Sequence, residues 1–299
     1  MSDDVAAQQV DPSAETVFVS AERADETTGL PGPLARLTKA DLSTLRWWLI
    51  TRIAVLIAVG ASAWLLTSGK GKPSGIFARW VQWDAVNFNV IAQFGYAGDG
   101  SRKAPYFEAF FPGFPLTLRP LVNLGVPVGL AGLLVSATAL AVAVVALRRL
   151  GDLEAGTGVG ERAALLLMLS PWAVFLMAGY SEALFLAFAI PAWLAAKRGH
   201  WWLACALAMG ASATRVTGLF LALALIVQFG LYAKDRWTKW PALLLPFFPP
   251  LLYTVYQQQR TGDWSVWLTA QKENWNRTFT LPWDAWETTW RGAFGGGQP

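Results

Sequence analysis

The sequence predicts an all-α fold, a polytopic bundle of transmembrane helices with amphipathic helices in its first extracytoplasmic loop. Three observations predict it. Hydrophobic residues make up 54% of the 299 residues and charged residues only 15%, against about 25% in an ordinary soluble domain. The apolar residues gather in runs of membrane-spanning length, and Lys and Arg gather in the short segments between them. This composition excludes a cytosolic enzyme, a disordered chain and a nucleic-acid-binding module.

Residues 1–44 are expected to form a disordered, acidic cytoplasmic tail. Residues 1–28 hold seven acidic side chains and one basic one, a net charge of −6, whereas the remaining chain carries +10. The segment is polar and lacks a periodic apolar face, as is typical of disorder. No basic stretch leads into an apolar core at its start, so it does not resemble a signal peptide.

Residues 45–257 are expected to hold seven spans of about 20 residues each. Basic residues precede the first span and follow the second, fourth and sixth. All of these lie inside if the N-terminus of this multi-pass plasma-membrane protein is cytoplasmic. The loop 68–124 and the Trp-rich segment 258–299 then lie outside the cell. The predicted spans are 46–67, 125–147, 161–179, 182–197, 201–215, 217–233 and 239–257.

The stretch 109–124 is apolar but contains Pro112, Pro115, Pro120 and Arg119. Counting it as a full span would place the later basic loops outside. We therefore expect a partly embedded segment on the outer side, where irregular backbone must be buried in protein or line a wet cavity.

The stretch 79–96 is predicted to be an amphipathic helix lying at the membrane interface, with Trp80 and Trp83 in the headgroup zone. Asp84 lies beside these aromatic residues. It is either an acid on the helix surface or a catalytic base facing a cavity, because partial desolvation raises the basicity of a carboxylate.

Tyr180, Ser181 and Glu182 lie between the third and fourth predicted spans. They are either a helix cap or the lining of a polar cavity, and one residue can do both. Arg215 lies roughly 21 Å along its span from Trp201, in the outer part of the membrane. An Arg there needs an anion, which is Glu182, Asp84 or a lipid phosphate.

The C-terminal segment 258–299 combines Trp residues with amides, among them Gln271 and Trp275. Aromatic faces and amides suit sugar rings, and an interfacial aromatic belt is the alternative. The segment ends in GGGQP without a closing span, as expected of a chain truncated before further spans. His200 and Cys205 are the only residues of their types, and no nucleotide-binding motif is present, so neither a metal nor a cofactor is expected.

Several short motifs, in order along residues 45–290, resemble the PIG-V-like mannosyltransferases, and in composition their actinobacterial members. This family lies within the GT-C superfamily of polytopic glycosyltransferases. The motifs are Trp83-Asp84, Ile91-Ala92, Gly95-Tyr96, the FFPGFP stretch from Phe110 to Pro115, Ser170-Pro171, Tyr180-Ser181-Glu182, and Arg215 near Gly218.

The resemblance implies a GT-C-like bundle that transfers mannose with inversion from a polyprenyl-phosphate-mannose donor on the outer face. It implies Asp84 as general base and Arg215 as the ligand of the donor phosphate. It also implies a pocket lined by Trp83, Tyr180, Ser181 and Glu182, and contacts from Gln271 and Trp275 to a glycan, glycolipid or protein acceptor. Such a site needs no metal and no cofactor.

Two other functions would use the same residue types. A lipid-linked sugar flippase or transporter would also place Arg and acids inside the membrane, but it predicts repeated halves with broken spans. A non-catalytic subunit of an envelope glycan assembly complex predicts that Asp84 can be replaced without loss of function.

Overall fold

The computed structural model describes residues 37–66, 77–234, 236–278 and 280–295, and every element within them is helical. The all-α prediction is therefore confirmed for this part of the chain. The α-helices are α2 (Lys39–Leu66), α3 (Asp84–Phe94), α4 (Gly113–Asn123), α5 (Val128–Ala155), α6 (Val159–Leu169), α7 (Ser181–Lys197), α8 (Trp201–Thr214), α9 (Gly218–Tyr232), α10 (Arg236–Lys239), α11 (Phe248–Thr261), α12 (Val266–Trp275) and α13 (Pro282–Phe294). The 3₁₀ helices are η2 (Ala78–Trp80), η3 (Gly95–Ala97), η4 (Phe107–Ala109), η5 (Pro171–Val174) and η6 (Trp240–Phe247).

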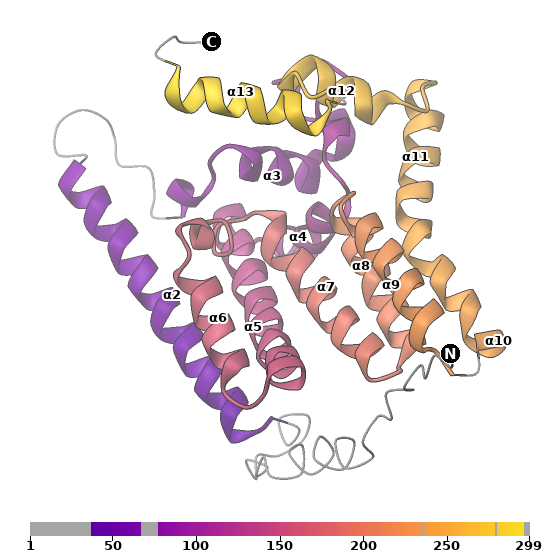
Figure 1. Ribbon diagram of the computed structural model, residues 1–299. Coiled ribbons are helices and arrows are strands. Elements are labelled where there is room, and N and C mark those ends of the chain that lie inside the picture. Colours follow the sequence, from indigo (N-terminus) through magenta and orange to yellow (C-terminus); the bar gives the residue numbers. More distant parts are fainter. Residues whose placement is uncertain (1–36, 67–76, 235, 279, 296–299) are drawn as a thin grey trace, which may run out of the picture.

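Helices α5 to α9 form the body of the molecule. Helix α7 packs between α5 and α8, and α2 packs along α5 and α6 (Figure 1). Helix α3 lies across one end of this bundle, where it contacts α4, and α12 and α13 lie beyond it (Figure 1). The turns that join α5 to α6 and α7 to α8 lie at the opposite end.

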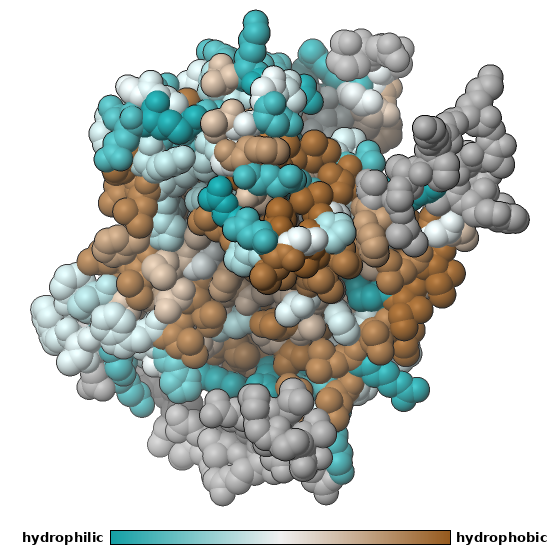
Figure 2. All heavy atoms as spheres, turned by 180° about the vertical axis from the view of Figure 1, so that it is seen from behind, coloured by the Kyte–Doolittle hydropathy of each residue, from teal (hydrophilic) through white to brown (hydrophobic). Residues whose placement is uncertain are grey.

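Among the described residues, two helices are long and apolar enough to cross a membrane: residues Lys39–Ser62 of α2, and α5. Helices α8 and α9 are apolar but have only 14 and 15 residues. Hydrophobic residues predominate across the middle of the molecule, with hydrophilic ones toward its two ends (Figure 2). This band has the character of a lipid-facing surface, and the seven-span topology remains a prediction.

Small residues let the helices of the bundle approach closely. A Cβ added to Gly132 of α5 would lie 2.8 Å from the Cα of Gly179, too close for any side chain. The Ser136 hydroxyl donates to the Ala178 carbonyl at 2.7 Å in the same crossing. Close backbone approach of this kind is typical of helices packed inside membranes. These contacts of Ala178 and Gly179 with α5 hold the backbone immediately before Tyr180 in place.

The beginning of α2 corrects the predicted end of the disordered tail. Helix α2 starts at Lys39, not after residue 44, because Asp41 is fully buried between helices. Its carboxylate pairs with Arg148 at 3.0 Å and with Arg149 at 2.6 Å, and it accepts from the Thr38 backbone N–H at 3.0 Å. A buried charge is tolerated when it is paired in this way. Residues 1–36, the greater part of the predicted tail, lie outside the described residues.

The predicted span 161–179 is wrong in its extent. Helix α6 has 11 residues and ends at Leu169. Ser170 is extended, with ψ 151°, because the ring of the following Pro171 disfavours a helical conformation in the residue before it. The chain continues as the 3₁₀ helix η5.

The predicted span 239–257 is also not one helix. Pro241 lies at the start of the 3₁₀ helix η6 and Pro246 within it, and α11 follows and runs on to Thr261. Proline removes a backbone donor at each position, which favours the tighter, irregular turns found here.

The predicted interfacial helix over 79–96 is shorter and more covered than expected. It begins at Asp84, and Trp80, expected in the headgroup zone, is buried. Residues 87–92 of α3 are all buried, so the helix is packed inside protein and not laid on a surface. The stretch 109–124 becomes η4 and α4, whose Phe114 and Leu118 are fully buried beneath α3.

Candidate active site

The site is built around the first residue of α3. Trp83 has φ 47° and ψ −123°, a conformation that side-chain-bearing residues seldom adopt, and it turns the chain sharply into Asp84. The Gln82 carbonyl accepts from the Ala85 N–H at 3.0 Å, and the Trp83 carbonyl accepts from the Val86 N–H at 3.0 Å. Strained backbone of this kind persists where its surroundings hold it, often at functional sites.

Tyr180 is one of the residues that hold this turn. Its hydroxyl donates to the Gln82 carbonyl at 3.0 Å, from the residue just before α7. Burial raises the pKa of Tyr180 to about 12, with further contributions from the charges of Asp84 and Glu182. The hydroxyl therefore stays protonated and able to donate. Tyr180 supports the turn that presents Asp84 and lines neither of the chambers described below.

The Asp84 carboxylate is half-buried and has no hydrogen bond or ion pair with any described residue. Burial and the nearby charge of Glu182 raise its pKa, while Arg277 and Arg215 oppose this shift. A carboxylate with a raised pKa and no partner is a stronger proton acceptor than an ordinary Asp. This environment suits a general base.

Arg215 lies in the sharp connection between α8 and α9. Its carbonyl accepts from the Gly218 N–H at 2.9 Å, and a Cβ on Gly218 would lie 2.4 Å from the Ser212 nitrogen, so only glycine fits this turn. The guanidinium donates to Glu182 Oε1 at 2.6 Å and to the Ser181 hydroxyl at 2.9 Å. Of the two protein anions considered for Arg215, the structure pairs it with Glu182. Its side chain remains 38% exposed, which leaves room for a second anion.

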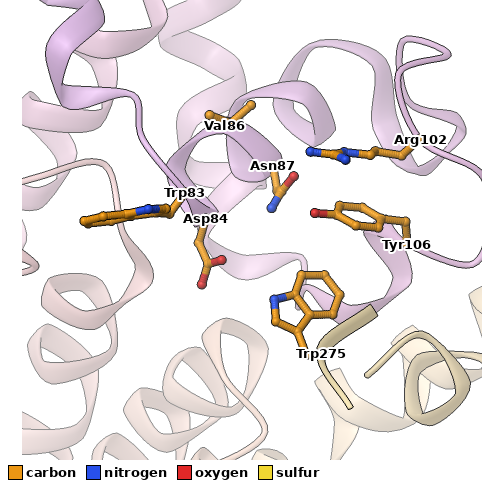
Figure 3. A pocket seen from close by; sticks show the side chains of 7 residues that line it. All are labelled: Trp83, Asp84, Val86, Asn87, Arg102, Tyr106 and Trp275. Atoms are coloured by element: carbon orange, nitrogen blue, oxygen red, sulfur yellow. The ribbon is translucent and has the colours of Figure 1, made fainter. Parts of the chain in front are cut away.

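Two chambers meet at Asp84. The Asn87 chamber, of about 380 Å³, is lined by Trp83, Asp84, Val86, Asn87, Arg102, Tyr106 and Trp275 (Figure 3). The Arg215 chamber, of about 200 Å³, has Arg215 and Arg277 as its cations, together with Ser181, Thr214, Thr217 and Gln271, and an aromatic wall. Asp84 and Trp275 line both, so a group bound in either chamber can reach the carboxylate.

The other predicted pocket residues differ in how directly they line the two chambers. Ser181 lines the Arg215 chamber. Glu182 does not line it but accepts a hydrogen bond from Arg215, which does. Trp83 is 75% exposed, and its ring points away from the Asn87 chamber toward Phe175 (Figure 3). Its backbone, more than its ring, shapes the site.

The predicted acceptor residues both reach the site. Trp275 stands at the boundary between the chambers and packs against Tyr106 with ring centroids 5.0 Å apart. Gln271 lies on the Arg215 side only. Its Nε2 donates to the Ala109 carbonyl at 3.1 Å, and its buried Oε1 has no partner among the described residues.

Sequence reasoning missed several lining residues, chiefly Arg277, Asn87 and Tyr106. Arg277 follows Asn276, which adopts a left-handed conformation with φ 50° at the end of α12. The Arg277 N–H then donates back to the Gln271 carbonyl at 3.2 Å, which turns the chain so that Arg277 lines the chamber. Asparagine tolerates this conformation better than most residues, and this is the one signal in the sequence.

A buried polar network supports the aromatic wall. Glu108 is buried and pairs with Arg260 of α11, and its carbonyl accepts from the Tyr253 hydroxyl at 2.7 Å. The same hydroxyl donates to the Phe110 carbonyl at 3.1 Å. The FFPGFP stretch is thereby tied to α11, with Phe110 and Phe111 facing the Arg215 chamber.

Within the described residues, no group of three or more His, Cys, Asp or Glu side chains is placed to hold a metal ion. Cys205 is buried in α8, and His200 precedes that helix, at the end of the bundle opposite α3 (Figure 1). The site therefore offers the Asp84 carboxylate, three guanidinium groups (Arg102, Arg215 and Arg277), amides and aromatic rings. This set of groups can accept a proton, hold an anion and pack against a sugar.

Comparison with known proteins gives a consistent result. A family model described as "Mannosyltransferase (PIG-V)" matches residues 70–238, more than half of the chain, including Asp84 and Arg215. No solved structure matches the chain.

Curated relatives carry the name "GPI alpha-1,6-mannosyltransferase 2". The protein of Rattus norvegicus is 37% identical over 151 residues, which are 46% of this chain and 29% of the relative. That of Homo sapiens is 35% identical over 158 residues, 48% of this chain and 30% of the relative. The protein of Cricetulus griseus is 35% identical over 175 residues, which are 54% of this chain and 33% of the relative. The matched regions thus span about a third of the length of these relatives.

Proposed function

Because the chain belongs to the PIG-V family of mannosyltransferases, we propose that it transfers mannose from a polyprenyl-phosphate-mannose donor to an acceptor hydroxyl on the extracytoplasmic face of the plasma membrane. The single observation that carries the site assignment is the unpartnered Asp84 carboxylate at the junction of two chambers, one of which holds two arginines. The names of the relatives support a glycolipid acceptor and an α-linked product.

The donor phosphate binds in the Arg215 chamber. Arg215 can exchange part of its contact with Glu182 for a phosphate oxygen, and Arg277 supplies a second positive charge. Guanidinium groups bind phosphate in a bidentate manner and cannot lose their charge at neutral pH. The polyprenyl chain leaves this chamber toward lipid.

Transfer then proceeds by a single displacement. The acceptor oxygen attacks the anomeric carbon and gives its proton to Asp84, and the bond from the anomeric carbon to the phosphate oxygen breaks with its electron pair. Both arginines stabilise the negative charge that develops on the departing phosphate. A single displacement inverts the anomeric centre, so an α-linked product requires a β-linked donor.

Loss of the proposed base tests this function. In membranes that contain the full-length protein and radiolabelled polyprenyl-phosphate-mannose, we expect Asp84→Asn to lower transfer by about 10²–10⁴-fold, the usual contribution of a general base. The matched control is Asp99→Asn, an exposed acid of the same loop, which should leave transfer unchanged.

The outcome of this comparison tests both the assignment of Asp84 as base and the identity of the donor. Equal transfer by wild type and Asp84→Asn would remove Asp84 from the chemistry and favour Glu182 as base. Absence of transfer from wild type, with the protein in the membrane, would contradict the donor assignment. It would then favour a transporter or a non-catalytic subunit.

A further inference from the structure

We infer that the Asn87 chamber is the subsite for a pyranose ring of the acceptor, and that Asn87 and Tyr106 set its specificity. This inference rests on the proposed function, since it divides the substrates of that reaction between the two chambers. It also moves the main acceptor contacts away from Gln271, which lines only the Arg215 chamber.

The first argument is the unpaired amide of Asn87. Its exposed fraction is 7%, yet its side chain makes no hydrogen bond with any described residue. Figure 3 shows this amide pointing into the chamber, toward Tyr106 and Trp275. The amide is open to the chamber and has no protein partner, so its donor and acceptor can bond a ligand that carries hydroxyls.

The second argument is the hydroxyl of Tyr106, which points toward the Asn87 amide (Figure 3) and also has no hydrogen-bond partner among the described residues. The Arg102 guanidinium lies 4.9 Å from the centroid of the Tyr106 ring, a cation–π contact that favours this orientation of the ring. Amide, phenol and carboxylate therefore face one space from three sides, as a polyhydroxylated ring requires.

The third argument is the aromatic platform. Tyr106 and Trp275 contact each other at an interplanar angle of 37°, and both line the chamber. The apolar C–H faces of a pyranose pack well on such rings. The chamber volume of about 380 Å³ falls in the range of about 300–1,000 Å³ that is common for small-molecule sites.

The fourth argument is the direction of attack. An inverting displacement needs the nucleophile on the side of the anomeric carbon opposite to the leaving group. The proposed function places the donor phosphate beside Arg215 and Arg277, and Asp84 lines both chambers. The acceptor hydroxyl therefore enters from the Asn87 chamber, where Asp84 can take its proton.

The test measures binding and turnover separately with octyl α-D-mannopyranoside as acceptor probe and a short-chain polyprenyl-phosphate-mannose as donor. In detergent-purified full-length protein, we expect Asn87→Ala to raise the KM for the mannoside at least tenfold and to leave the donor KM within twofold. Gln93→Ala is the matched control, because this exposed amide lies on the same helix and lines neither chamber. It should change neither constant.

A pair of variants at Tyr106 separates ring from hydroxyl. Tyr106→Phe keeps the platform and should raise the mannoside KM only severalfold, whereas Tyr106→Leu should raise it as much as Asn87→Ala. Equal effects of the two substitutions would overturn the stacking role. Thermal unfolding of each variant confirms that it is folded.

A readout without the donor distinguishes this inference from the proposed function. Saturation-transfer difference NMR on the sugar-ring protons should detect mannoside binding to wild type and Asp84→Asn, but not to Asn87→Ala. Such binding without any transfer would support the subsite while contradicting the transferase function. Three results would overturn the subsite. They are mannoside binding that persists in Asn87→Ala, no binding to wild type, or an Asn87→Ala variant with a raised donor KM and an unchanged mannoside KM.

Discussion

Both a negative charge, on Glu182, and positive charges, on Arg215 and Arg277, act on Asp84. Their effects on its pKa can be measured through the pH dependence of activity. If Asp84 is the base, as we propose, it must be ionised to work, and kcat/KM should rise with pH as Asp84 loses its proton. Its pKa is raised by burial and by Glu182, so this rise should occur above the ordinary value of 3.8.

The neighbouring charges predict the direction of each mutational shift in this acidic limb. Glu182→Gln removes a negative charge and should move the limb to lower pH, whereas Arg277→Gln removes a positive charge and should move it to higher pH. The measurement is kcat/KM across pH for each variant. Glu287→Gln, an exposed acid in α13, is the control and should shift nothing. Shifts of the same sign in both site variants would refute Asp84 as the titrating base.

At the residue scale, the charges that sequence reasoning found are those that stand out against apolar flanks. Asp84, Glu182 and Arg215 are costly near a membrane unless they have a role, and all three meet at the site. Arg277 and Asn87 do not stand out in this way. Arg277 follows a polar stretch, and which way Asn87 points depends on the packing of α3, which spacing alone does not reveal.

At the element scale, the link between η4 and α11 should carry a measurable part of the stability. Glu108 is buried and paired with Arg260, and removing one partner of a buried pair strands the other charge. We expect Glu108→Gln to lower the free energy of unfolding by about 3 kcal/mol, at the low end of the range for buried pairs. A value at this end follows because Arg260 keeps part of its side chain in solvent.

The matched control for this prediction is Glu287→Gln, which removes one partner of the exposed pair between Glu287 and Arg291 within α13. Its effect should stay below about 1 kcal/mol. Denaturation in detergent, followed by circular dichroism, provides the comparison. Similar losses for both variants would mean that the Glu108 pair does not support the wall formed by Phe110 and Phe111.

Element boundaries were predictable where the apolar pattern ends at a clear stop. Helices α7, α8 and α9 lie within two residues of their predicted ranges, between polar or glycine-containing turns. The prediction failed at three other prolines inside apolar runs, although Pro191 lies within α7 without ending it. Pro171 ends what hydropathy alone treats as one span, and Pro241 and Pro246 change the helix type without changing the hydropathy.

At the scale of the whole molecule, the site and the basic loops lie at opposite ends. Figure 1 places α3 and α12 at one end and the turns between α5 and α6 and between α7 and α8 at the other. Arg162, Lys197 and Arg198 lie in or next to the second group of turns, and the positive-inside rule predicts that this end is cytoplasmic. The distribution that the sequence predicted from charge therefore agrees with the arrangement of the helices. The charge pattern did not predict the buried, paired Asp41 in the first turn of α2.

Cysteine labelling tests this orientation. Cys205 is the only cysteine and is buried, so Cys205→Ser provides a background without thiols. In that background, Ser101→Cys should react with a membrane-impermeant maleimide on intact cells. His200→Cys should react only after the membrane is permeabilised. The reverse pattern would place Asp84 in the cytoplasm and contradict the proposed topology.

The position of Asp84 between two chambers also has a consequence for wasted substrate. A base at a shared boundary activates whatever hydroxyl reaches it, and water reaches an unfilled Asn87 chamber more readily than a large acceptor does. With donor bound and acceptor scarce, the same carboxylate should direct water at the anomeric carbon and release free mannose. Under the proposed mechanism, this futile hydrolysis should decline as acceptor concentration rises, because bound acceptor excludes water from the Asn87 chamber.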